Sequence, residues 1–98
     1  MQRGVLVTVS WPALIASSDV LADLESVVLC PATRDLRNAV FRVSVEPTPA
    51  HGLRSLSQVM VDKLSTLPRA KISQALGRLD DEGMNAIDRA LLWVLGVI

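Results

Sequence analysis

The chain has very little cysteine and histidine, and this scarcity excludes several kinds of site. Among its 98 residues there is one cysteine, Cys30, and one histidine, His51. A single cysteine cannot form an intrachain disulfide, and one histidine with one cysteine cannot make a zinc site of the usual ligand spacing. Cys30 lies in an apolar run, where a small buried hydrophobic role is expected rather than that of a nucleophile. We therefore expect neither a metal nor a cofactor.

The chain also lacks long hydrophobic runs and net charge. No apolar stretch reaches about 18 residues, so no transmembrane helix is expected, and the N-terminus has no hydrophobic run followed by a signal-peptide cleavage site. The ten basic and ten acidic side chains cancel, which weakens the case for a strongly basic nucleic-acid-binding domain. The sequence predicts a cytoplasmic protein without membrane contact, folded as a single domain over residues 1–98.

The charge is nevertheless distributed unevenly along the chain. Residues 34–78 carry eight basic and three acidic side chains, a balance of +5. Residues 1–33 carry one basic and three acidic side chains, and residues 79–98 carry one and four, which gives −2 and −3. The basic middle segment predicts either a locally basic surface or a solvated surface of mixed charge.

Short apolar and β-branched runs indicate six strands. The runs with this composition, or with the period-two alternation of strands, are residues 5–9, 13–16, 25–33, 40–45 and 57–62. Residues 70–76 fit either a strand or one or two turns of helix, and only the family resemblance given below favours a strand. Residues 66–69 are expected to form a turn. Residues 46–52, which include His51, are rich in proline and glycine and are expected to form a loop.

Helical signals occur in two places. Ser17, Ser18 and Asp19 are typical of the cap of a short helical turn over residues 20–24. Near the C-terminus Asp80 or Asp81 caps a longer helix, which Gly96 is expected to end. The apolar residues that recur there at spacings of three or four, as on one face of a helix, are Met84, Ile87, Leu91 and Val94 or Leu95.

These elements predict a mainly β fold with a C-terminal helix, of the α+β class. The arrangement expected is a small, SH3-like antiparallel β-barrel closed by the amphipathic helix. Short strands leave unpaired edges unless the sheet closes or pairs with another copy of the chain. A barrel, a homodimer or both are therefore expected on physical grounds.

A resemblance to a known family is densest over residues 53–98. This segment reads LRSLSQVMVDKLSTLPRAKISQALGRLDDEGMNAIDRALLWVLGVI. It resembles the C-terminal half of the MazF/PemK toxins, the ribosome-independent endoribonucleases of bacterial toxin–antitoxin pairs. The most specific segments are Gln58–Lys63 and Gly77–Leu79.

The resemblance extends upstream and covers nearly the whole chain. Residues 3–9 resemble the family's opening strand, residues 11–15 its second strand, and residues 28–33 its third, with the following loop at residues 34–37. The resemblance implies a barrel of the MazF and CcdB type that works as a homodimer. It also implies metal-free attack of a ribose 2′-hydroxyl on the adjacent phosphate of single-stranded RNA, and a cognate antitoxin that blocks the groove.

In this family two side chains carry most of the catalysis, and only one of them has a match here. Thr33 matches the threonine that ends the third strand. Trp11, however, stands before Pro12, where the family has an arginine, and the loop between the first two strands is reduced to Ser10 and Trp11. A guanidinium stabilises the negative charge of the transition state, and losing such a group typically costs about 10²–10³ in rate.

Other side chains are candidates for binding RNA. Arg34, Arg37 and Arg54 are possible replacements for the missing arginine, and Arg34 shares a pocket with Thr33 only if the strand ends at Thr33. Trp11 either stacks on a base or fills space by packing. The remaining candidates, which either contact RNA or form cross-strand pairs, are Gln58 and Lys63.

The resemblance leaves three functional hypotheses open. The first is an active endoribonuclease toxin. The second is a degenerate, weakly active or inactive binding module that keeps the dimer and the antitoxin site, and Trp11 favours it. The third is a gyrase poison of the CcdB type that acts through its C-terminal helix, which the end Trp93–Ile98 resembles only loosely.

Overall fold

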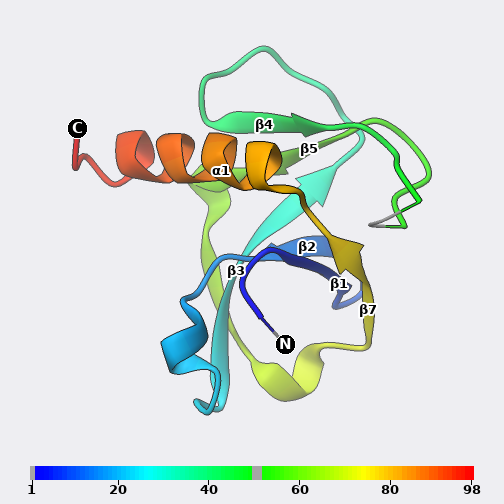
Figure 1. Ribbon diagram of the computed structural model, residues 1–98, viewed down its shortest axis with the longest axis vertical. Coiled ribbons are helices and arrows are strands. Elements are labelled where there is room, and N and C mark those ends of the chain that lie inside the picture. Colours follow the sequence, from blue (N-terminus) through cyan, green and yellow to red (C-terminus); the bar gives the residue numbers. More distant parts are fainter. Residues whose placement is uncertain (1, 50–51) are drawn as a thin grey trace.

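The computed structural model describes residues 2–49 and 52–98, and the strands in these residues form one curled antiparallel sheet (Figure 1). One helix, α1 (Asp81–Val94), follows the sheet. This arrangement confirms the predicted mainly β fold with a C-terminal helix. The position of His51 lies outside the described residues. The strands are β1 (Val5–Thr8), β2 (Pro12–Ile15), β3 (Ser26–Thr33), β4 (Arg42–Val45), β5 (Ser57–Met60), β6 (Ser65–Pro68) and β7 (Gln74–Arg78).

Strand β3 is the longest strand and connects the two halves of the sheet. The strand order is β4–β5–β3–β2–β1–β7, and β6 pairs with β3 beside β5. The start of β3 pairs with β6 and its end pairs with β5, with Thr33 opposite Gln58. In Figure 1, β4 and β5 therefore lie next to α1 at one end of β3, whereas β1, β2 and β7 lie together at the other side of the molecule.

The sheet has one more strand among the described residues than the sequence predicts. Residues 66–69 were expected to be a turn, but Ser65–Pro68 pairs with β3 as the strand β6. Only Leu67 in β6 is even partly buried, so its sequence carries little alternation and its pairing with β3 decides its structure. Pro68 is compatible with the strand because it is the last residue.

Three other predicted strands have a boundary that is wrong by two residues or more, and the helical turn predicted over residues 20–24 is the 3-10 turn Asp19–Leu21. The strand expected over residues 57–62 ends at Met60, where the 3-10 turn Val61–Lys63 begins. The last strand lies at Gln74–Arg78 rather than at residues 70–76, because the 3-10 turn Arg69–Lys71 precedes it. The strand expected over residues 40–45 begins only at Arg42.

The helix α1 has the ends that the sequence predicts. Asp80 is its N-cap, and the Asp80 carboxylate accepts the Gly83 N–H at 2.7 Å. At the other end Gly96 has a φ of +74°. The N–H groups of Gly96 and Val97 bond to the carbonyls of Trp93 and Leu92, which is the Schellman arrangement.

The predicted apolar stripe of α1 packs against one face of the sheet. Ile87 is fully buried there, and the partly buried members of the stripe are Met84, Leu91 and Val94. Leu95, the alternative to Val94, is 60% exposed. Trp93, expected in the core or on a dimer surface, is 54% exposed and stacks on Phe41 with ring centroids 6.4 Å apart.

Cys30 is fully buried in the hydrophobic cluster that also contains Ile87 of α1, as expected for a small hydrophobic residue. Burial raises the pKa of the Cys30 thiol from 9.0 to about 11, with Arg3 opposing and Asp62 adding to this effect. The thiol therefore ionises at lower pH in the unfolded chain, so unfolding releases a proton between about pH 9 and about pH 11. The stability that the buried, protonated thiol contributes is fully present below about pH 9 and is lost as the pH rises to about 11.

We expect this loss to be on the order of 2 kcal/mol and to require the thiol. The measurement is the free energy of unfolding in urea at about pH 8 and about pH 10.5. The comparison is with Cys30→Ala, which lacks the titrating group while other groups titrate as before. An equal pH dependence for both proteins would contradict the prediction.

Candidate functional site

Thr33 is the last residue of β3 and lies between strands β2 and β5. Its direct partner on β5 is Gln58. On the β2 side Ala13 lies opposite Pro31, and the same register continued by two residues places Trp11 opposite Thr33. Residues directly opposite each other in a sheet project to the same face. Thr33, Trp11 and Gln58 therefore share one face at the end of β3.

This face is the one turned away from helix α1. Successive residues of a strand point to opposite faces. Ala32 and Val59, which neighbour Thr33 and Gln58 in sequence, are buried in the cluster that contains Ile87 of α1. Thr33 itself is only partly buried. The side chains beside it therefore lie on the opposite face. Further along β3 that face holds a second buried cluster, which includes Leu29 and Ala13. At the end of β3 it is the outer face, where the loop after β3 lies.

The loop after β3 brings two arginines next to Thr33. The sequence predicts that Arg34 shares a pocket with Thr33 only if the strand ends at Thr33, and β3 does end there. The hydroxyl oxygen of Thr33 accepts the Asp35 N–H at 3.1 Å. The Asp35 carboxylate pairs with the Arg37 guanidinium at 3.1 Å, and both side chains are 68% exposed. Arg34 is exposed.

Gln58 holds this loop through its side-chain amide. Its Oε1 accepts the N–H of Arg37 at 2.8 Å, and its Nε2 donates to the carbonyl oxygen of Arg37 at 2.9 Å. Gln58 is only 9% exposed. Its amide is therefore used to fix the loop, and its predicted contact with RNA stays a prediction.

Arg42 is a site residue that the sequence did not reveal. Its Nη1 donates to the carbonyl oxygen of Asp35 at 2.7 Å and to Oε1 of Gln58 at 3.2 Å. Alternation along residues 40–45 places Arg42 on the polar face of its strand. That face reaches Thr33 only because β4 pairs with β5 and β5 pairs with the end of β3, and neither pairing is visible in the sequence.

The other residues predicted to contact RNA are Trp11, Arg54 and Lys63, and the structure does not bring all of them to Thr33. Trp11 is 40% exposed, opposite Thr33. Arg54 is exposed in the segment before β5. Lys63 is exposed in the 3-10 turn beyond the far end of β5, so the structure does not bring it to Thr33.

The connection between β1 and β2 is a tight reversal beside this site. It consists of Val9, Ser10 and Trp11, and the Val9 N–H bonds to the carbonyl oxygen of Trp11 at 3.0 Å. Ser10 has a φ of +108°, a backbone conformation that residues with a side chain rarely adopt. This reversal replaces the longer loop that the family resemblance implies.

In residues 2–49 and 52–98 no group of three or more His, Cys, Asp or Glu side chains could hold a metal ion. No helix within these ranges is long and apolar enough to cross a membrane.

The fold and the site define a small half-barrel protein with a hydroxyl and several guanidinium groups on one outer face. The family model described as PemK-like, MazF-like toxin of type II toxin–antitoxin systems matches residues 9–95. The chain belongs to this family. A relative, the probable endoribonuclease MazF of Mycolicibacterium smegmatis, is 38% identical over 96 residues, which are 97% of this chain and 88% of the relative.

Solved structures share the fold over nearly their whole length. An endoribonuclease in complex with its cognate antitoxin, from a mycobacterial species, superposes with a TM-score of 0.87 at 25% identity, covering 100% of this chain and 97% of that one. The Mycobacterium tuberculosis toxin MazF-mt6 has a TM-score of 0.83 at 23% identity, covering 96% and 97%. The second likeness concerns the fold alone.

Proposed function

We propose that this toxin is a metal-independent endoribonuclease that cleaves single-stranded RNA at short motifs, as a homodimer in the cytoplasm. The observation that carries the proposal is the position of Thr33, a partly exposed hydroxyl at a strand end beside a loop that holds Arg34 and Arg37. Family membership supports it. The relative named as a probable endoribonuclease supports it as well.

The chemistry follows from the groups on this face. The ribose 2′ oxygen attacks the adjacent phosphorus, the bond to the 5′ oxygen breaks, and a cyclic phosphate remains. Thr33 already accepts the Asp35 N–H, so its own O–H is available to donate to a phosphate oxygen. Arg34 and Arg37 attract the RNA backbone. Trp11 is placed to stack on a base beside the cleaved bond.

A cognate antitoxin is the second partner in this proposal. The endoribonuclease that superposes with the whole chain was solved in complex with its own antitoxin. We expect an antitoxin segment to cover the outer face at the end of β3, where the exposed cations of Arg34 and Arg37 favour acidic residues. Binding there would exclude RNA.

One observation favours a second function, that of a binding module without useful nuclease activity. Trp11 stands before Pro12, where the family resemblance implies an arginine, and it brings no charge to the phosphate. In that case the fold, the dimer and the antitoxin site persist while cleavage is weak or absent.

The two functions separate in a cleavage assay. The purified protein is incubated with a defined RNA in the presence of EDTA, with an oligonucleotide of the same sequence in DNA as control. We expect cleavage of the RNA alone, with a cyclic phosphate at the new 3′ end. Tight antitoxin binding with neither RNA cleavage nor growth arrest would contradict the nuclease and support the binding module.

A further inference from the structure

Arg42 is held beside Thr33 without an acidic partner. Its contacts are the carbonyl oxygen of Asp35 at 2.7 Å, Oε1 of Gln58 at 3.2 Å and the sulfur of Met60 at 3.5 Å. All three acceptors are neutral, so no carboxylate in the described residues is hydrogen-bonded to the guanidinium. The ion pairs in residues 2–49 and 52–98 are Arg3–Asp88 and Arg37–Asp35.

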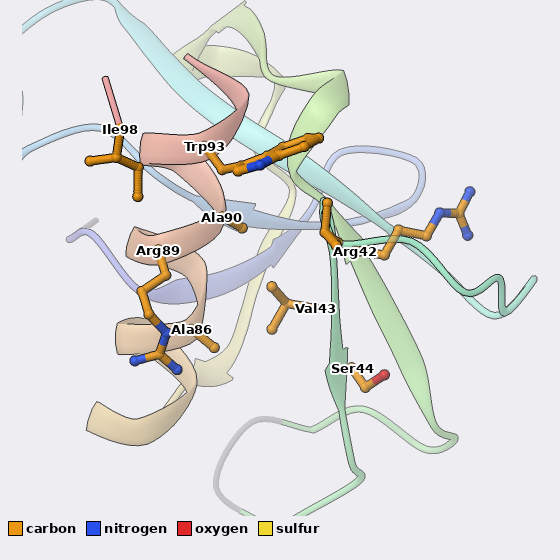
Figure 2. Close-up of a pocket in the computed structure, with 9 residues that line it drawn as sticks. Arg42, Val43, Ser44, Ala86, Arg89, Ala90, Trp93 and Ile98 are labelled. Carbon is orange, nitrogen blue, oxygen red and sulfur yellow. The ribbon is translucent and has the colours of Figure 1, made fainter. Parts of the chain in front are cut away.

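Asp35 fixes the guanidinium and the hydroxyl relative to each other. The N–H of Asp35 bonds to the Thr33 hydroxyl oxygen, and its carbonyl oxygen accepts from Arg42. The two functional groups are thus bonded to opposite ends of one residue. Figure 2 shows the side chain of Arg42 extending away from α1 and from the shallow pocket between α1 and β4.

The guanidinium keeps donors for a further ligand. In the described residues its Nη1 has two acceptors and its Nη2 has one, the sulfur of Met60, whereas its Nε has none. The Nε–H and the other N–H of Nη2 remain, and together they form the fork that binds two oxygens of a phosphate. A guanidinium fixed in place before the substrate arrives stabilises developing negative charge more effectively than a mobile one.

The other arginines of this face are less suited to that task. Arg37 is paired with the Asp35 carboxylate, and its side chain is 68% exposed, where water screens its charge. Arg34 is exposed on the loop, and no side chain in the described residues fixes its guanidinium. Arg42 is therefore the arginine beside Thr33 that is both fixed in position and without an acidic partner.

We propose that Arg42 binds the phosphate at which the RNA is cleaved and stabilises the negative charge of the transition state. This inference rests on the proposed ribonuclease function. In the reaction the 2′ oxygen bonds to phosphorus and its proton passes to solvent. The bond to the 5′ oxygen breaks, and that oxygen takes a proton from solvent. Arg42 donates two hydrogen bonds to the non-bridging oxygens and remains charged throughout.

The test compares Arg42→Ala with Arg89→Ala, an arginine on the exposed side of α1 that also borders the pocket. Arg42→Ala is expected to lower kcat about 10²–10³-fold, whereas Arg89→Ala stays within about twofold of the unmodified protein. Arg42→Lys keeps the charge but loses the fork, so it should recover only part of the rate. Full activity of Arg42→Lys would overturn the proposal that Arg42 donates two hydrogen bonds to the phosphate.

A binding measurement separates contact with phosphate from a general loss of positive charge. The probe is an all-deoxy oligonucleotide of the cleaved sequence, which binds without reacting. Arg42→Ala should reduce the slope of log affinity against log salt by about one. Arg89→Ala, which removes a charge from the exposed side of α1, on the opposite side of the sheet from the Thr33 face, should leave that slope unchanged. Equal slopes for Arg42→Ala and the unmodified protein would overturn the proposal.

The outcomes also distinguish this inference from the proposed function. If Thr33→Ala abolishes cleavage and Arg42→Ala stays within about twofold of the unmodified protein, the nuclease function stands and the role of Arg42 fails. If the unmodified protein cleaves no RNA, the nuclease function fails. The deoxy oligonucleotide then decides whether Arg42 contacts phosphate at all. If Arg42→Ala does not fold, Arg42→Lys decides the role of Arg42.

Discussion

Replacing Thr33 with alanine is expected to lower the rate of RNA cleavage about 10²–10³-fold while the protein stays folded. The substitution removes the hydroxyl that, in the proposed reaction, donates to the phosphate. Thr33 lies at the partly exposed end of β3, and its hydroxyl accepts one hydrogen bond, from Asp35. Losing that bond costs only about 1 kcal/mol of stability. The measurement is the cleavage rate at saturating RNA, together with a thermal melt.

Two variants control the Thr33 experiment. Thr33→Ser keeps the hydroxyl and should retain activity within about tenfold of the unmodified protein. Thr66→Ala removes an exposed threonine from β6, opposite Val28, far from the end of β3, and should leave the rate unchanged. A Thr33→Ala protein that cleaves RNA as fast as the unmodified protein would remove Thr33 from the reaction.

The substitution Ile87→Ala is expected to lower the free energy of unfolding by about 2–5 kcal/mol. Ile87 is fully buried where α1 packs on the sheet, in contact with the cluster that contains Leu6 and Val59. Truncation leaves a cavity between α1 and the sheet, and a close-packed interior relaxes only partly around it. For a domain of this size, 1 kcal/mol shifts Tm by about 4–8 °C.

The measurement is urea unfolding at fixed protein concentration, with Leu24→Ala as the matched control. Leu24 is 54% exposed in the connection between β2 and β3, and its truncation removes the same number of carbon atoms. We expect Leu24→Ala to cost less than about 0.5 kcal/mol. Equal losses for the two variants would mean that α1 does not stabilise the sheet through Ile87.

The features predicted correctly from the sequence are those set by local chemistry. The cap at Asp80, the apolar stripe and Gly96 define α1 within its own residues, and the helix begins and ends there. Strand β6 has no comparable local signal. Its side chains are mostly exposed, and β3 supplies the partner that makes it a strand.

In the candidate site, too, some residues were suggested by the sequence and others are placed there only by the folded structure. Thr33 was predicted from a family resemblance at one strand end. Arg42 was not predicted, because its position near Thr33 depends on the pairing of β3 with β5, on the pairing of β4 with β5 and on the folded loop between β3 and β4. Gln58 was predicted as a contact for RNA, but its amide bonds to the loop, which only the folded loop could reveal.

The tight reversal between β1 and β2 has a consequence for how substrate arrives and leaves. Val9, Ser10 and Trp11 span at most about 10 Å even when extended, so this hairpin tip is too short to fold over the end of β3 as a flap. On this side the strand end stays uncovered throughout turnover. In the proposed ribonuclease, RNA would enter and depart past Trp11 without waiting for this hairpin to open, and a competing inhibitor would meet the same entrance.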